Sequence, residues 1–349
     1  MNNLRLGIIG AGEIAHFSAA SIARATGVTL TAVADVNSAR ANDLARRRGA
    51  QFVYEDAQAL LQADTTDAVY IAVPNCFHAE VANAALAAGK HVLLDKPFAL
   101  NLAEATSVAS CARTHQRVLM LGMNTRFDAR VQRARSIVAS NNLGPVYHAK
   151  ASWRRRAGIP RIGSWFTSKD SAGGGALLDI GVHMLDAALY VLDNFEPRSV
   201  SGIVENRFGR RALGEGQWGR SERTAAPFDV DDHALALIRM ANGQSLTLET
   251  SWALHQPKAD LQELELYGED AGAAVFEDSL YYNGNAGAYQ IQQGMGGTPD
   301  FAHGCRVQNF VNTIAGTEEP MVTVDQALAV QKIIDAIYQS AASGTEVKL

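Results

Sequence analysis

The sequence is short of the features that mark secreted and membrane-spanning proteins. Only three cysteines occur in 349 residues, at positions 76, 111 and 305, and none belongs to a Cys-x-x-Cys pair. This odd, scattered set predicts free thiols in a reducing compartment and no metal site. No run of 18 or more apolar residues is free of charge, and the first residues lack a signal-peptide pattern. We therefore expect a cytoplasmic protein that does not bind a membrane.

The sequence also lacks a basic excess, internal repeats and low-complexity tracts. It holds 31 lysines and arginines against 36 aspartates and glutamates, a net charge of −5. A chain without surplus positive charge cannot neutralise many phosphates, so we expect no nucleic-acid partner. The hydrophobic content of 47% is ordinary for a globular protein, and 349 residues suggest about two domains.

The first third of the chain alternates between short apolar runs and helical periodicity. Strands are predicted at 4–10, 28–35, 51–54, 67–73, 91–94 and 117–121, with helices at about 38–48, 56–62, 77–88 and 102–114 between them. A helical pattern also follows the first strand, to about residue 25. Such alternation is typical of a doubly wound parallel sheet, and we expect it to form a domain over 1–123.

A glycine pattern follows the first strand at a position suited to a dinucleotide. Gly10-Ala11-Gly12-Glu13-Ile14-Ala15 matches G-x-G-x-x-G/A between a strand and a helix, where backbone N–H groups can bind a pyrophosphate. Asp35 ends the second strand, where it would bind ribose hydroxyls and repel a 2′-phosphate, which favours NAD. Alternatively, Asp35 is a turn residue or helix cap. Arg40 could accept that phosphate, so NADP stays possible.

Polar clusters follow two later strands, at the edge of the sheet where ligands bind. Pro74 and Asn75 end one strand, and Asn75 could donate to a cofactor hydroxyl or cap the next helix. Another strand ends in Asp95-Lys96-Pro97. A lysine partly withdrawn from water can give or take a proton near neutral pH. The alternative is that Lys96 extends outwards and pairs with Asp95.

Residues 175–192 are predicted to form one buried helix with a narrow polar stripe. Asp179, His183 and Asp186 fall within an arc of about 60°. Burying them without partners would cost several kcal/mol, so the stripe must face partners or a polar cavity. A carboxylate beside an imidazole in a cavity is suited to acid–base chemistry. The alternative is that Asp179 and His183 pair with each other or cap a loop; we treat Asp186 as structural.

The motifs together resemble a known family. Gly10 to Ala15, Pro74-Asn75-x-x-His78, Asp95-Lys96-Pro97, and Gly173-Gly174-Gly175 with Asp179-x-x-x-His183 occur in the order typical of the glucose–fructose oxidoreductase, inositol 2-dehydrogenase and rhizopine-catabolism (Gfo/Idh/MocA) family. The resemblance implies an N-terminal Rossmann domain and a C-terminal α/β domain with an open, mostly antiparallel sheet. It implies NAD(P)-dependent redox chemistry on sugars, cyclitols or related polyols. One departure is Asp95, where the family usually has glutamate.

The resemblance and the residues together predict three groups of site residues. The catalytic group is Lys96, Asp179 and His183. The cofactor group is Gly10, Gly12, Glu13, Ile14, Asp35, Arg40, Pro74, Asn75, His78, Asp95 and Lys96. The substrate group is Arg154, Trp153, Trp165 and Asn124, because an arginine and aromatic faces suit a polyol or sugar ring; a solvated strand edge is the alternative for Arg154-Arg155-Arg156.

The remainder of the chain, 124–349, is predicted to be a substrate-binding and oligomerisation domain. Strands are expected at 146–154, 199–208, 263–267 and 273–276, with a hairpin over 233–254 around Asn242-Gly243. Residues 209–227 and 282–302 are predicted to be long loops. Helices are expected at 303–315 and 324–341, the last packing back towards the nucleotide domain. The family implies a homodimer or homotetramer through the sheet.

These residues suggest the oxidation of a secondary hydroxyl, with hydride transfer to the nicotinamide. His183 would be the direct base, Lys96 its proton partner, and Asp179 would position the substrate or hold the histidine tautomer; the two base roles could be exchanged. A glycoside hydrolase that oxidises its substrate transiently with bound NAD is one alternative. A non-catalytic dinucleotide sensor is another, although the presence of Lys96 and His183 argues against it.

Overall fold

The computed structural model describes residues 3–219, 222–284, 287–298 and 304–349. Its first half contains a six-stranded sheet in the order β3-β2-β1-β4-β5-β6, with every neighbouring pair parallel. This is the predicted doubly wound fold. The strands are β1 (Leu4–Ile9), β2 (Val28–Ala34), β3 (Phe52–Tyr54), β4 (Ala68–Ile71), β5 (His91–Leu94) and β6 (Leu119–Leu121).

Helices cover this sheet, so its central strands are apolar throughout. They are α1 (Glu13–Ile22), α2 (Ser38–Arg48), α3 (Ala57–Gln62), α4 (His78–Ala87) and α5 (Leu102–His115). Local sequence fixes their ends. The α2 helix, for example, begins where the Asn37 side chain accepts the Arg40 N–H, and it ends at Gly49, whose φ of 74° suits glycine.

The second half is built on a nine-stranded sheet in the order β14-β13-β12-β11-β7-β10-β9-β8-β15. Its neighbouring strands are antiparallel except for the parallel β7–β10 pair. The strands are β7 (Val146–Arg155), β8 (Pro197–Glu205), β9 (His233–Met240), β10 (Ser245–Ser251), β11 (Asp260–Gly268), β12 (Ala271–Ala274), β13 (Ser279–Asn283), β14 (Tyr289–Gln293) and β15 (Val347–Lys348). The predicted open, mostly antiparallel sheet is confirmed.

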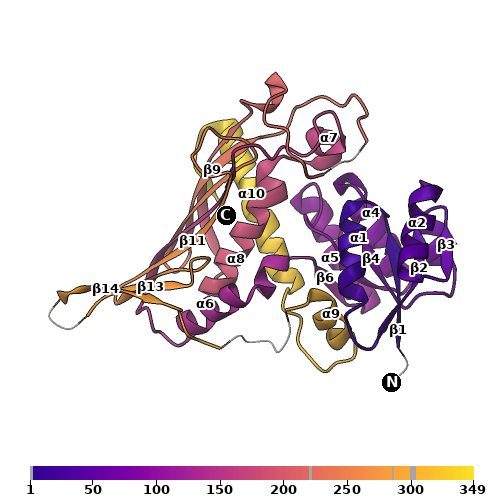
Figure 1. Cartoon of the computed structure of the whole chain (residues 1–349), viewed down its shortest axis with the longest axis horizontal. Coiled ribbons are helices and arrows are strands. Elements are labelled where there is room, and N and C mark those ends of the chain that lie inside the picture. Colours follow the sequence, from indigo (N-terminus) through magenta and orange to yellow (C-terminus); the bar gives the residue numbers. More distant parts are fainter. Residues whose placement is uncertain (1–2, 220–221, 285–286, 299–303) are drawn as a thin grey trace.

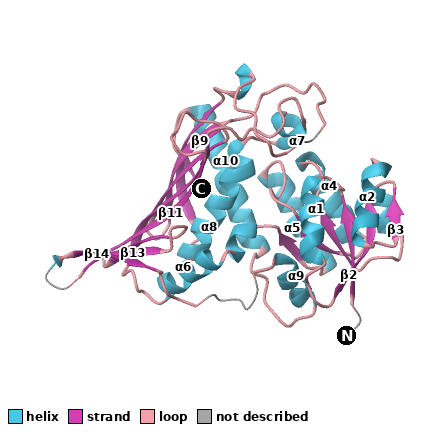
Figure 2. Cartoon of the chain, viewed as in Figure 1, coloured by secondary structure: helices cyan, strands magenta, loops and turns pink. Residues whose placement is uncertain are grey.

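Helices lie between this sheet and the parallel sheet, on one face of the larger sheet (Figures 1 and 2). They include α6 (Ala129–Ala139), α8 (Val182–Leu192) and α10 (Val324–Ser343), while α7 (Lys169–Ala172) and α9 (Arg306–Ile314) lie closer to the first half. The α10 helix packs on β8 and on α5, where Asp335 Oδ2 accepts the Leu102 N–H at 2.7 Å.

Two segments differ from the sequence-based expectation. Residues 282–302, predicted to be a loop, contain strand β14, which pairs with β13 in a hairpin. Both of its faces are exposed, so its polar residues gave no alternating signal. Residues 175–192 do not form one regular helix, because a π-helical turn at Leu177–Gly181 precedes α8.

The helical stretch that contains this π turn is unusually apolar. Among the residues that the structure describes, Lys169–Leu192 is the one stretch long and apolar enough to cross a membrane by length and composition. However, 94% of its most apolar window is buried inside the protein. It therefore has the surroundings of a core helix.

Candidate active site

A cleft of about 750 Å³ opens at the carboxyl ends of the parallel strands. It is lined by residues of both halves of the chain, from Gly10, Gly12 and Asp35 at one side to Lys96 and Asp179 at the other. Predicted cofactor residues in its wall are Gly10, Gly12, Glu13, Ile14, Asp35, Arg40, Pro74, Asn75, His78, Asp95 and Lys96. A cleft at this edge of a doubly wound sheet is the usual place for a dinucleotide.

The glycine loop leaves room for a phosphate group. Gly10 has a φ of +94°, and a Cβ there would lie 2.5 Å from the Ala72 carbonyl oxygen. A Cβ at Gly12, which precedes α1, would meet no atom within 4 Å. The backbone at Gly12 therefore borders open space at a helix N-terminus, which fits the pyrophosphate of NAD.

Asp35 orders the same loop. Its Oδ2 accepts the Ala11 N–H at 2.6 Å and its Oδ1 accepts the Asn37 N–H at 2.7 Å. These contacts show the predicted turn-stabilising role. Each carboxylate oxygen has two lone pairs, so both retain acceptor capacity for ribose hydroxyls.

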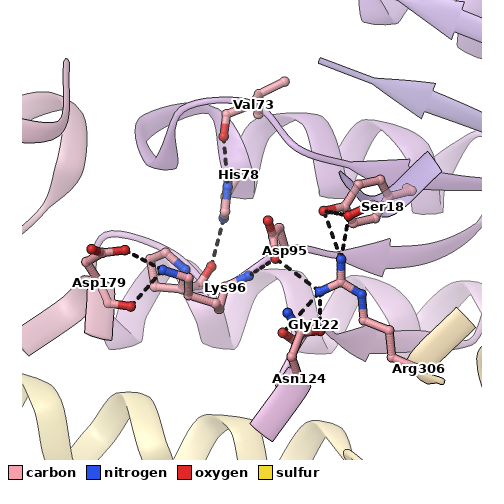
Figure 3. A network of polar contacts seen from close by, with 11 residues as sticks. Ser18, Val73, His78, Asp95, Lys96, Gly122, Asn124, Asp179 and Arg306 are labelled. Atoms are coloured by element: carbon pink, nitrogen blue, oxygen red, sulfur yellow. Dashed lines mark hydrogen bonds and ion pairs between the residues drawn. The ribbon is translucent and has the colours of Figure 1, made fainter. Parts of the chain in front are cut away.

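Lys96 reaches across the cleft to the other half of the molecule. Its Nζ lies 2.6 Å from Asp179 Oδ1 and 2.7 Å from the Asp179 carbonyl oxygen (Figure 3). The ammonium does not extend outwards to Asp95, whose Oδ1 instead accepts the Lys96 backbone N–H at 3.0 Å. Since an ammonium group has three N–H bonds, one remains for a ligand in the cleft.

Asp179 is held by partners on both of its carboxylate oxygens. Oδ1 binds Lys96, and Oδ2 accepts the indole N–H of the fully buried Trp252 at 2.9 Å. Burial favours the protonated carboxyl, but the Lys96 ammonium and these hydrogen bonds outweigh it and lower the pKa of Asp179 below its ordinary value. Asp179 is therefore an anion at neutral pH.

His183 follows Asp179 by four residues but is not its hydrogen-bond partner in the described structure. Its Nδ1 is buried, with no partner among the described residues, and the Trp153 ring lies 6.0 Å away between centroids. Desolvation, with a further contribution from the Lys96 charge, lowers the pKa of His183 to about 3. The imidazole is thus neutral at physiological pH.

Arg306 supports the other side of the Asp95-Lys96 turn. From the start of α9, its guanidinium donates to Ser18 Oγ at 2.6 Å and Asn124 Oδ1 at 2.5 Å, and it lies 3.6 Å from Asp95 Oδ1 (Figure 3). A Cβ at Gly122 would lie 2.8 Å from Arg306 Nη1 and 2.9 Å from Asp95 Oδ1. Glycine at 122 therefore allows these two groups to approach.

Comparison with known proteins agrees with this arrangement. The model of the "Oxidoreductase family, NAD-binding Rossmann fold" (GFO_IDH_MocA) matches residues 4–123, and the "GFO/IDH/MocA C-terminal domain" matches residues 131–274. The D-glucoside 3-dehydrogenase of Escherichia coli (strain K12) is 35% identical over 349 residues, covering 99% of this chain and 97% of its own. The chain belongs to the Gfo/Idh/MocA family.

Solved structures of other family members agree in fold along the whole chain. A levoglucosan dehydrogenase in complex with NADH and L-sorbose superposes with a TM-score of 0.84 at 25% identity, covering 100% of this chain and 99% of its own. GenD2 from gentamicin A biosynthesis, in complex with NAD, gives 0.81 at 26% identity and covers 100% and 97%. This Gfo/Idh/MocA protein is accordingly an NAD(P)-dependent dehydrogenase.

Two residues of the Pro74-Asn75-x-x-His78 motif make fixed contacts in this family member. Asn75 does not cap α4; its side-chain amide donates to the Ala172 carbonyl at 2.8 Å and so links the two halves. Both nitrogens of His78 lie at hydrogen-bond distance from carbonyls, 2.7 Å from Pro97 and 3.1 Å from Val73. Burial lowers the pKa of His78. The motif thus secures the turn that carries Lys96.

The four substrate candidates occupy different places. Trp153 lies beside His183, and Trp165 lies in the cleft wall, stacked on Phe166 at 3.8 Å. Arg154 lies on the opposite face of β7, bound to Glu263 at 2.7 Å and Glu249 at 3.4 Å. The side-chain oxygen of Asn124 accepts a hydrogen bond from Arg306. Of the four, Trp165 therefore lies in the cleft wall and Trp153 lies beside His183.

Sequence reasoning missed three residues of this site. Arg155 lies on the Trp153 side of β7, stacks over its ring at 4.7 Å, and contributes to the lowered pKa values of Asp179 and His183. Trp252 and Arg306 are the other two. Strand alternation could have placed Arg155 with Trp153, but no local signal links Trp252 or Arg306 to residues so distant in sequence.

Proposed function

We propose that this protein oxidises a secondary ring hydroxyl of a sugar, cyclitol or related polyol reversibly, with NAD as the hydride acceptor. The observation that carries this proposal is the contact between Lys96 of the dinucleotide half and Asp179 of the other half, both of which line the cleft. It joins a cation and a carboxylate to the cofactor cleft at one place, as alcohol oxidation requires. His183 follows Asp179 by four residues but is not among the residues that line the cleft.

Lys96, His183 and Asp179 have different roles in moving and stabilising the proton of the substrate hydroxyl. Gly12 and Asp35 would hold NAD in the cleft, and the bound cofactor would supply the acceptor for the hydride on the carbon that bears the hydroxyl. The remaining N–H of Lys96 donates to the substrate oxygen and stabilises negative charge that develops there. His183, being neutral, accepts the hydroxyl proton. Asp179 fixes the position of the ammonium through its side chain and its carbonyl.

We propose D-glucosides as the first substrates to test, because the 35%-identical relative is named a D-glucoside 3-dehydrogenase. Purified protein is incubated with NAD or NADP and a panel of glucosides, anhydrosugars, aldoses and inositols, and NADH or NADPH is followed by absorbance. We expect reduced cofactor to form in proportion to a 3-keto or other ketone product. Glycoside cleavage without net NADH, or no turnover across the panel, would contradict the proposal.

We also propose that the protein forms homodimers or homotetramers through the open face of the nine-stranded sheet. This face exposes the cross-strand neighbours Ile203 and Leu235, which are 53% and 41% exposed. Apolar side chains on an uncovered sheet face are typical of a subunit interface. Sedimentation analysis of the protein and of Leu235→Lys tests it: we expect an oligomer that the substitution weakens, and a monomeric parent protein would refute it.

We further propose that the protein is cytoplasmic. The three cysteines of the chain are all free thiols, as expected for a protein kept in a reducing compartment. Cell fractionation with an antibody against the protein tests this placement.

A further inference from the structure

An ion pair joins the two halves of the chain at the adenosine end of the cleft. Arg40 Nη2 lies 2.5 Å from Glu222 Oε1, although the residues are 182 positions apart. Arg40 belongs to α2, which follows β2 and Asp35, whereas Glu222 belongs to the long segment after β8. Both residues line the cofactor cleft together with Asp35.

The segment that carries Glu222 is fixed to the second half by several contacts. Glu215 accepts the Ile162 N–H at 2.8 Å and pairs with Arg223 at 2.8 Å. The Thr224 N–H donates to the Gly163 carbonyl at 2.8 Å. Glu215 before it and Arg223 and Thr224 after it make these contacts, so they help to hold the Glu222 carboxylate over the cleft.

The other cations of α2 have different partners. Arg46 and Arg47 pair with Asp43, and Arg48 donates to the His16 carbonyl. Among the described residues that line the cleft, Arg40 and Lys96 are the only lysines or arginines, and Lys96 lies at the Asp179 end. Arg40 is therefore the cation placed to meet a phosphate on an adenosine ribose bound at Asp35.

We propose that Glu222 selects the cofactor: by pairing with Arg40 it occupies the one guanidinium that a 2′-phosphate would need, and so favours NAD over NADP. The proposal rests on the NAD-dependent function proposed above, which it refines. Asp35 lines the same cleft and adds a second carboxylate there. A 2′-phosphate must displace Glu222 from Arg40 and is repelled by Asp35.

The test measures cofactor binding without any sugar. NADH and NADPH are titrated by fluorescence onto the full-length protein and onto Glu222→Gln. We expect the wild type to bind NADH more tightly. In Glu222→Gln, the released Arg40 can form charge-assisted hydrogen bonds to the phosphate, so NADPH binding should tighten about tenfold while NADH changes less than about twofold. The gain should shrink as sodium chloride is raised, because the groups are exposed.

Two further variants separate this role from a general effect of charge or folding. Glu80→Gln removes another exposed carboxylate from the cleft wall but leaves the Arg40–Glu222 pair intact, so the ratio of the two dissociation constants should stay unchanged. Arg40→Ala added to Glu222→Gln should abolish the gain. An unchanged ratio in Glu222→Gln, an equal shift for both cofactors, or tighter NADPH binding by the wild type would overturn the proposal. None of these outcomes depends on sugar turnover.

Discussion

Asp179 and Asp186 lie seven residues apart on one helical segment, yet their surroundings differ completely. Asp186, on α8, forms a two-pronged ion pair with Arg126 at 2.6 and 2.8 Å, and both side chains are 0% exposed. Asp179, on the π turn, binds a lysine from the other half at the wall of a cleft. A buried carboxylate with a closed set of partners stabilises the fold, whereas one that borders a cavity can hold a reacting group in place.

A π turn lies at the Asp179 end of this segment. The Val182 N–H donates to the Leu177 carbonyl, five residues earlier, rather than to a carbonyl four residues earlier as in a regular α-helix. Within this turn, the Asp179 carbonyl accepts Lys96 Nζ at 2.7 Å. Single π turns are frequent at functional sites, and this one brings backbone and side-chain acceptors of one residue to the same ammonium.

The largest effect is expected from Lys96→Met, which removes the partner of Asp179. This change removes the ammonium but keeps an unbranched side chain of similar length. We expect kcat to fall about a thousandfold or more, because proton transfer and charge stabilisation are both lost. NADH binding, followed by fluorescence titration, should persist. Turnover close to that of the wild type would remove Lys96 from the mechanism.

The structural role of Asp186, at the other end of the helical segment, is tested by Asp186→Asn. The substitution leaves the Arg126 charge buried without a full counter-charge, so we expect the free energy of unfolding to fall by about 3 kcal/mol. Urea unfolding measures it. The matched control is Asp179→Asn on the same segment, which should impair activity more than stability. If the two variants lost stability and activity in the same proportions, the distinction between the two carboxylates would fail.

A smaller effect is expected from Trp252→Phe. The phenyl ring fills most of the indole volume but cannot donate to Asp179 Oδ2, so the carboxylate keeps only the Lys96 contact at its side chain. We expect kcat to fall about tenfold, since one hydrogen bond to a charged group is worth about 1.5–3 kcal/mol and the substitution retains the rest of the site. KM for NAD should change little. A change confined to thermal stability would limit Trp252 to packing.

The last prediction concerns acid stability. The pKa of His183 is about 3 in the folded protein and near 6.5 when unfolded, so only the unfolded chain takes up the proton between these values. Stability is therefore complete above about pH 6.5 and is lost as pH falls towards 3. His183→Gln should weaken this dependence, measured as unfolding free energy at pH 7, 6, 5 and 4. An unaltered slope would show that His183 does not titrate in this way.

The sequence predicted those parts of the molecule that depend on local patterns. Residues 38–48 form a helix between Asn37 and Gly49, as expected, because both ends carry capping residues. The polar stripe of Asp179, His183 and Asp186 was recognised from its spacing. Asp179 was expected to face the site and Asp186 to be structural, but their partners Lys96 and Arg126 could not be named, because these lie 83 and 60 residues away.

Other differences have similar physical reasons. Strand alternation puts neighbouring residues on opposite faces, but the sequence does not show which face of β7 meets α8. In the structure, Arg155 rather than Arg154 accompanies Trp153. Strand β14 was missed because a hairpin with both faces exposed has no apolar face to reveal it. The roles of the site residues remain predictions that the variants above test.

The position of Arg306 has a consequence for how the chain becomes a folded protein during synthesis. Its guanidinium completes a polar cluster with Ser18, Tyr70 and Asp95 of the parallel sheet, but it is made only after strands β1–β14. A ribosome-bound fragment that ends at residue 123 would hold that carboxylate and those hydroxyls without their cation. The nucleotide half, although first to emerge, therefore reaches its final stability only when the last part of the chain has been translated.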